Sequence, residues 1–342
     1  MMPTDPSMAD SREATASFDT AAQRQRIARR ERLFGLLQRH GALIVLIIIV
    51  ALSALSFERF FTTRNIENIL VQTSFLGLIV VGVTFVIISG GIDLSVGSQL
   101  ALGGVIAGYC VPVFWPLGLL VPPLITGAIG MVNGLIITKW KLEPFIVTLA
   151  ALLSVRGLAF AITNEKTIGI PRESAFTWFG RGDIFGIRVP IIITLLAFVV
   201  AGIILTRTKY GKAIFAIGGE ESAARLMGIA VDRAKITAYT VSGMLAGLSG
   251  ALLAARLSAG QPVAGPGWEL DAIASVVVGG TLLTGGAGSM SGSLAGVLLL
   301  GMLRNLINQV GTLSAYWQQV VSGLFLLVVV TAQTYLTQQR RR

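Results

Sequence analysis

The sequence predicts an all-α polytopic membrane protein. Of its 342 residues, 54% are hydrophobic and only 13% are charged, and the mean hydropathy is +0.77, well above the values of soluble domains. Several runs without a charged residue are as long as the roughly 17–25 residues that cross hydrocarbon as a helix. None of them alternates apolar and polar residues as a transmembrane strand does. The chain is therefore expected to cross the membrane as helices.

Charged residues and Pro/Gly breaks divide the apolar runs into about ten predicted spans. A broken helix is expected near 90–97, where glycines interrupt the apolar pattern. The transmembrane domain as a whole is expected to cover residues 41–336. The predicted spans are 41–57, 67–89, 94–113, 117–138, 144–163, 189–206, 236–256, 270–284, 288–308 and 316–336.

Basic residues predict the topology. Residues 1–40 are expected to form a cytoplasmic tail that ends in a basic amphipathic segment, RQRIARRERLFGLLQRH, which suits an anionic lipid surface. With this end inside, the loops 165–188 and 257–269 are expected to face outward as non-helical segments, and 139–143, 207–235 and the basic C-terminus 337–342 are cytoplasmic too. The four cytoplasmic segments hold 7, 2, 6 and 3 of the 27 basic residues, as the positive-inside rule predicts. The net charge of +10 is therefore a topology signal and does not indicate nucleic-acid binding.

The sequence lacks the residues that several kinds of functional site require. The only cysteine, Cys110, leaves no intrachain disulfide, and the only histidine, His40, leaves no His-based metal site or triad. The only Gly-Lys pair, Gly211-Lys212, has Thr206 where a phosphate-binding loop needs its first glycine. No enzyme activity and no cofactor of its own are expected for this chain.

Asp93, in the segment SGGIDLSVGS, interrupts two uncharged runs. An ionised carboxylate in hydrocarbon costs a few kcal/mol, so Asp93 is expected inside protein, in a water-filled cavity or near an interface. Two roles stay open: an N-cap for the helix that starts near residue 94, and contact with a transported substrate. Other polar side chains of the spans either line a path or bond neighbouring helices: Ser95, Ser98, Gln99, Asn133, Asn305, Asn308 and Gln319.

Arg156 raises the same question in another uncharged span. It is expected either to reach the outer interface or to pair with a carboxylate inside the bundle. Glycines four residues apart, such as Gly243 and Gly247, predict helix faces buried against other helices. The segments GGIDLSVG at 90–97 and GGTLLTGG at 279–286 share one Gly-Gly-x-x-Leu frame, which chance and duplication explain equally well.

The cytoplasmic segment 207–235 contains a predicted short helix. Glu220 and Glu221 are expected in its first turn, and Gly228 after its end near Met227. Gly218 is expected, with the following glycine, to turn the chain into this helix. Such a helix either docks on a partner or rests on lipid. The candidate docking residues are Gly219, Glu220, Glu221, Ala223, Ala224, Arg225 and Gly228.

Four motifs, in this order along the chain, resemble the permease subunit of the ribose-type family of bacterial ABC importers, which take up monosaccharides. They are SGGIDLSVGS, AIGGEESAARLMGI, ELDAIASVVVGGTLLTGGAGS and WQQVVSGLFLLVVV. The resemblance covers about residues 60–335. The segments ELDAIASVVVGGTLLTGG and GTLSAYWQQ are most similar to one permease of the galactofuranose importer.

This resemblance implies a homodimer or heterodimer of ten-helix subunits in the bacterial inner membrane, with both termini cytoplasmic. It implies a periplasmic sugar-binding protein outside and, inside, an ATPase with two fused nucleotide-binding halves that binds ATP and Mg. The segment 207–235 then corresponds to the coupling region, since Ala223, Ala224 and Gly228 match the Ala-Ala-x-x-x-Gly core of the importer motif. Ser222 stands where glutamate is usual. The alternative is an ion-coupled transporter or channel, which needs more ionisable groups in the spans than Asp93 and Arg156.

Overall fold

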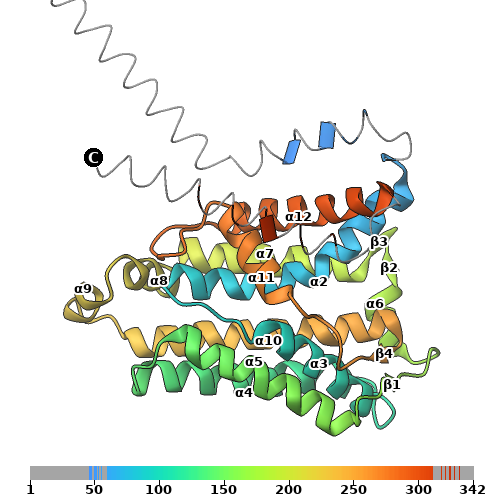
Figure 1. Cartoon of the computed structure of the whole chain (residues 1–342), viewed down its shortest axis with the longest axis horizontal. Helices are drawn as coiled ribbons and strands as arrows, with labels where there is room; N and C mark the ends of the chain where they lie inside the picture. Colours follow the sequence, from blue (N-terminus) through green and yellow to red (C-terminus); the bar gives the residue numbers. More distant parts are fainter. Residues whose placement is uncertain are drawn as a thin grey trace, which may run out of the picture.

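The computed structural model describes residues 60–310 continuously and a few isolated residues between 46 and 55 and between 317 and 331. The predicted spans 41–57 and 316–336 fall mostly outside the described residues. The two predicted cytoplasmic tails and Gln319 fall outside them entirely. The described chain is a bundle of helices with two short strand pairs (Figure 1).

Within residues 60–310, eight helices make up the bundle, and shorter elements connect them. The bundle helices are α2 (Thr63–Ile88), α3 (Val96–Cys110), α4 (Leu117–Lys139), α5 (Pro144–Thr163), α7 (Val189–Arg207), α10 (Val231–Leu257), α11 (Trp268–Val278) and α12 (Met290–Val310). The connecting helices are η1 (Ala175–Thr177), α6 (Trp178–Arg181), α8 (Lys209–Gly219) and α9 (Glu221–Leu226). The antiparallel strand pairs are β1 (Ile168–Gly169) with β4 (Ala259–Gly260), and β2 (Asp183–Ile184) with β3 (Ile187–Arg188).

Six of the described helices, α2, α4, α5, α7, α10 and α12, are long and apolar enough to cross a membrane. The other two bundle helices are shorter than predicted. α3 has 15 residues and α11 has 11, which at 1.5 Å per residue gives about 22 and 16 Å, against a hydrocarbon thickness of about 30 Å. Each of these helices covers only part of its predicted span, 94–113 or 270–284, and the count of ten spans stays a prediction.

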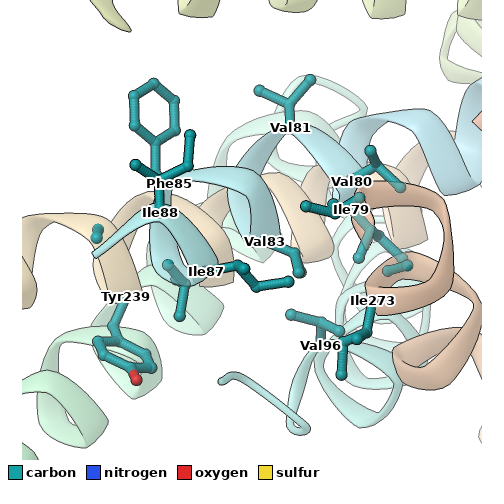
Figure 2. Close-up of a cluster of buried hydrophobic side chains, with 14 of the residues drawn as sticks. Ile79, Val80, Val81, Val83, Phe85, Ile87, Ile88, Val96, Tyr239 and Ile273 are labelled. Atoms are coloured by element: carbon teal, nitrogen blue, oxygen red, sulfur yellow. The ribbon is translucent and has the colours of Figure 1, made fainter. Parts of the chain in front are cut away.

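Helix α2 lies at the centre of the fold. It is apolar on every side, and 94% of its most apolar 18-residue segment is buried. This is expected of a helix enclosed by others. Figure 2 shows its side chains, among them Val83 and Ile87, clustered with Val96 of α3, Tyr239 of α10 and Ile273 of α11. In helix α5, only 22% of the most apolar 18-residue segment is buried, so this helix lies at the outside of the bundle.

Glycines let the inner helices approach closely, as the four-residue spacings predict. A Cβ at Gly103 of α3 would overlap the backbone of Gly247 on α10, and one at Gly130 of α4 would overlap the carbonyl of Tyr239. Helix α10 accordingly packs along α4, α3 and α2. These glycine faces have a structural role in helix packing.

The two ends of the bundle carry different elements. Helices α8 and α9 project at one end, and the strand pairs, η1 and α6 lie at the other (Figure 1). The β1–β4 pair joins the two loops, 165–188 and 257–269, that were expected to face outward. These loops were expected to be non-helical, but the first contains η1 and α6. The segment 207–230 and both loops thus lie at opposite ends, as the predicted topology requires.

Candidate functional site

The first helix break follows α2. Gly90, with φ +79°, receives the end of the helix: its N–H donates to the Ile87 carbonyl at 2.9 Å, and the Gly91 N–H donates to the Val86 carbonyl at 3.0 Å. These two bonds form a Schellman motif, which satisfies the last carbonyls of a helix. An irregular stretch then runs to Val96, where α3 begins. The broken helix predicted near 90–97 is confirmed.

A second break follows α11 and has the same chemistry. The Gly280 N–H donates to the Val277 carbonyl at 2.9 Å, the Thr281 N–H donates to the Val276 carbonyl at 3.2 Å, and Gly280 has φ +90°. In the first break the left-handed residue is the first glycine of the pair, Gly90. In the second break it is the second glycine of the pair, Gly280. The frame shared by the two sequence segments therefore does not align their backbones.

The two breaks meet at the end of α2, next to α8. The N–H of Gly286, in the stretch between α11 and α12, donates to the carbonyl of Ile88 at the end of α2, at 2.9 Å. Backbone that is not helical at membrane depth is tolerated where protein encloses it or where it lines a solvated path. Broken helices of this kind mark the substrate sites of many transporters.

Asp93 lies in the first break and is fully buried. Its Oδ1 accepts from the Ser95 N–H at 3.0 Å and from the Ser95 hydroxyl at 2.5 Å, and its Oδ2 accepts from the Ser242 hydroxyl of α10 at 2.8 Å. The residue at the N-cap position of α3 is Ser95, so Asp93 holds the stretch before the helix and does not cap the helix itself. Hydrogen bonds to a charged acceptor are among the strongest in proteins.

The network extends from Ser95 to a third helix. The Ser95 hydroxyl also accepts from Gln99 Nε2 at 2.6 Å and from Asn133 Nδ2 of α4 at 3.2 Å. Ser98 donates to the Ser95 carbonyl at 2.8 Å. Ser95, Ser98 and Gln99 are completely buried and Asn133 is 4% exposed. The structure thus brings five predicted path residues together, but as a buried network that joins α3, α4 and α10.

Asn305 does not belong to this network. It lies on α12, where its Nδ2 donates to Asn65 of α2 at 2.9 Å and its Oδ1 accepts from Gln309 at 2.8 Å. Asn308 lies on the same helix. The amide pair of Asn65 and Asn305 ties α2 to α12.

Arg156 bonds backbone carbonyls instead of a carboxylate, and its expected reach to the outer interface stays a prediction. Its Nη1 donates to the carbonyls of Pro262 at 3.0 Å and Ala264 at 2.5 Å, in the loop before α11. Among the described residues, no carboxylate lies within 4.0 Å of it. It does interact electrostatically with Glu269. Arg156 therefore tethers the loop that leads into the second broken helix.

Sequence reasoning missed Glu269, which lies in the first turn of α11. Its Oε1 accepts from the Gly267 N–H at 3.1 Å, while its Oε2 is buried without a hydrogen-bond partner among the described residues. A Cβ at Gly97 of α3 would overlap that Oε2. The beginnings of α3 and α11 are thus in contact.

An ion pair between Asp271 of α11 and Arg304 of α12 was also missed. Asp271 is 8% exposed, and its Oδ2 accepts from Arg304 Nη2. Asp93 and Arg156 are therefore not the only ionisable groups within the predicted spans, and Asp93 is not the only buried carboxylate. The available signal was an arginine within an apolar helix, which normally has a partner inside the bundle.

The segment 207–235 contains the expected short helix, α9, preceded by a second helix, α8. Glu221 begins α9, but Glu220 occupies its N-cap position and is not in the first turn. Gly218 and Gly219 form the last turn of α8, and the chain turns instead at Glu220, with φ −159°. Gly228, at φ +79°, ends α9 as predicted.

The surface of α9 differs from the expectation. Ala224 was expected to face a partner, but it is 2% exposed and packs into the core of this chain. Arg225 is already bonded to Glu221 at 3.0 Å and to Asp232 at 2.6 Å. The exposed residues of α9 and its C-cap are Ser222, Ala223, Arg225, Leu226 and Met227, and the two large apolar ones, Leu226 and Met227, are 89% and 79% exposed. A six-residue helix has too few turns for its sequence to show which face is buried.

The six apolar helices, the two facing breaks and the buried polar network define a multi-pass membrane protein of the transporter class with discontinuous helices. The chain belongs to the family described as "Branched-chain amino acid transport system / permease component", whose profile matches residues 65–330. The members are membrane transport components rather than enzymes.

Several curated relatives are similar over most of their length. The ribose import permease protein RbsC of Bacillus subtilis is 44% identical over 299 residues, covering 86% of this chain and 92% of the relative. RbsC of Escherichia coli K12 is 42% identical over 305 residues, covering 86% and 93%. The L-arabinose ABC transporter permease protein AraH of Azospirillum brasilense is 37% identical, covering 90% of each chain. No solved structure matches the chain.

Proposed function

We propose that this chain is the permease subunit of an ATP-binding cassette importer that passes a monosaccharide across the bacterial inner membrane. The main support is the similarity to ribose import permeases, which are 42–44% identical to this chain over 92–93% of their length. The L-arabinose permeases, at 36–37%, are named for a second pentose. A pentose is thus the first cargo to test, and galactofuranose, to which two sequence segments point, is the second.

The proposed topology has both termini, 207–235 and 139–143 in the cytoplasm, with 41–336 as the transmembrane domain of about ten helices. Two observations support it. Basic residues concentrate in these segments, and α8 and α9 lie at the opposite end of the bundle from the two loops assigned to the outside (Figure 1). The basic part of the N-terminal tail rests on anionic lipid in this arrangement.

The proposed partners are a second permease subunit, identical or homologous, a periplasmic sugar-binding protein and an ATPase with two fused nucleotide-binding halves. ATP and Mg are bound by the ATPase. Helix α9 is the docking element for that ATPase, which the exposed apolar side chains of Leu226 and Met227 at its tip support. The loops 165–188 and 257–269 receive the binding protein at the other end.

The test is transport by the complex of permease, cognate ATPase and binding protein in proteoliposomes. D-ribose, L-arabinose and galactofuranose are offered separately, with ATP inside or outside the vesicle. We expect uptake that needs ATP on the side of α9 and binding protein on the other. Uptake that needs neither, but follows a proton or sodium gradient, would show an ion-coupled transporter instead.

A further inference from the structure

We propose that four glycines, Gly90, Gly218, Gly285 and Gly286, form a backbone junction through which α8 moves both broken helices together during transport. This glycine junction joins three segments that are distant in sequence: the break after α2, the end of α8, and the stretch between α11 and α12. The inference rests on the proposed role of α9 as the element that receives motion from the ATPase.

At the four glycines, the segments approach each other backbone to backbone. A Cβ on Gly285 would lie 2.9 Å from the Cα of Gly90 and 3.0 Å from the Cα of Gly218, and one on Gly286 would lie 2.9 Å from the Cα of Gly219. A Cβ on Gly218 would overlap the Ile88 carbonyl oxygen and the Gly286 nitrogen. Those two atoms are the partners of the 2.9 Å hydrogen bond that joins the breaks.

The glycines serve two physical purposes. Gly90, Gly285 and Gly286 have φ of +79°, +85° and +75°, a region that costs other residues about 1 kcal/mol or more. Gly218 has an ordinary helical backbone within α8, so its conformation needs no glycine. What the position requires is the absence of a side chain, because α8 ends directly on the hydrogen bond between the breaks.

Helix α8 is anchored well enough to transmit a displacement. Ile214 and Ile217 are 0% and 2% exposed and belong to the central core. The helix continues through one residue, Glu220, into α9, whose tip is exposed. Close-packed contacts without flexible side chains transmit strain because they cannot relax by changing rotamers. A shift of α9 therefore reaches the end of α2 and the stretch before α12 at the same point.

The consequence is a coupled movement of two half-helices. The break after α2 leads into α3, and the stretch at the junction follows α11. The beginnings of α3 and α11 contact each other at Gly97 and Glu269. If both breaks move together, the beginnings of α3 and α11 move together as well. If only one break moved, these two helix ends would slide past each other.

The first experiment adds a single methyl group at the junction. Gly218→Ala is compared with Gly202→Ala on α7, where the nearest atom to the new Cβ is Met290 Cβ at 3.8 Å, an ordinary contact. Uptake per ATP hydrolysed is measured in the reconstituted complex. We expect it to fall about tenfold for Gly218→Ala, within the 5–150-fold range of typical coupling, and to stay at the wild-type value for Gly202→Ala. Equal ratios for both variants would overturn the junction.

A second measurement uses the unaltered protein and so does not depend on whether Gly218→Ala folds. Amide hydrogen exchange is followed in the full complex with and without a non-hydrolysable ATP analogue. We expect residues 89–95 and 279–289 to change together with 209–228. A change in only one break, or in neither, contradicts the proposal.

A third variant separates this inference from the function on which it rests. Leu226→Asp with Met227→Asp places two charges on the tip of α9 without touching the junction. If this double variant keeps wild-type stimulation of ATP hydrolysis by loaded binding protein, the proposed role of α9 fails. If it loses stimulation while Gly218→Ala transports like Gly202→Ala, only the junction fails.

Discussion

Single side chains hold the broken helices in place, and Asp93 is a fully buried example. It accepts three hydrogen bonds, from two groups of Ser95 and from Ser242. Ser242→Ala removes the only donor from α10. We expect a loss of about 1–3 kcal/mol of stability, the usual cost of leaving a buried polar group unsatisfied.

Thermal unfolding in detergent measures this cost, with Thr237→Ala on the exposed face of α10 as the control. A role of Asp93 in contacting cargo would give the opposite pattern. In that case Ser242→Ala would change the relative rates at which different sugars are taken up, and it would leave the unfolding temperature unchanged.

The pair of Asp271 and Arg304 makes a second prediction at this scale. Their side chains are 11% and 25% exposed. Arg304→Leu leaves the carboxylate without its guanidinium, and breaking a buried pair in this way costs about 3–5 kcal/mol. We expect a large drop in unfolding temperature, partly restored by adding Asp271→Asn. A double variant no more stable than Arg304→Leu would show that the ion pair is unimportant for stability.

At the scale of elements, α9 is held by a small charge cluster. Glu221 is bonded to Arg225 and to Lys235. Partial burial raises the pKa of the Glu221 carboxyl, but hydrogen bonds and attraction from Lys235 and Arg225 outweigh it, so the net pKa lies below the usual 4.5. A lowered pKa in the folded state stabilises the fold above the ordinary value, and this is lost as the pH falls through the folded pKa.

We therefore expect α9 to loosen below about pH 4.5. Amide exchange of residues 221–228, corrected for the intrinsic effect of pH, measures this loosening. Glu221→Gln is the control, because it removes the titrating group and should make the protection of α9 independent of pH in this range. Unchanged pH dependence in that variant would assign the effect to another carboxylate.

The exposed tip of α9 carries the prediction for ATPase docking. Leu226→Asp with Met227→Asp should weaken co-purification with the ATPase, since charges are disfavoured at the centre of an interface. Val263→Asp is the control: it also puts a charge on an exposed apolar position, 56% exposed, but in the loop at the opposite end. Equal recovery of ATPase with both variants would place docking elsewhere.

The sequence was informative about some elements and not about others, for physical reasons. Long uncharged runs become helices because lipid leaves no other partner for the backbone, and Gly90 with Gly91 reveals the first break. The second break escaped prediction because apolar residues continue past Val278, while the helix end depends on the left-handed Gly280. Ala224 was misplaced because burial of a short helix is decided by tertiary packing, which local sequence does not encode.

At the scale of the whole molecule, the topology is directly testable. Met227 and Phe185 are 79% and 101% exposed at opposite ends of the bundle. In a Cys110→Ser background, we expect an impermeant thiol reagent to label Phe185→Cys from outside the cell and Met227→Cys only in inverted vesicles. Labelling of both from the same side would reject the assigned topology.

The bond between Asp93 and Ser242 spans 149 residues of chain. At about 5–20 residues per second of synthesis, this separation corresponds to roughly 7–30 s. During that interval, the carboxylate has been made but its partner on α10 has not. A nascent chain arrested before α10 therefore lacks the Ser242 donor that ties the first break to the bundle. Synthesis therefore leaves the first break incomplete until α10 has been made. Any factor that protects nascent membrane chains has to act on this protein between the synthesis of α3 and that of α10.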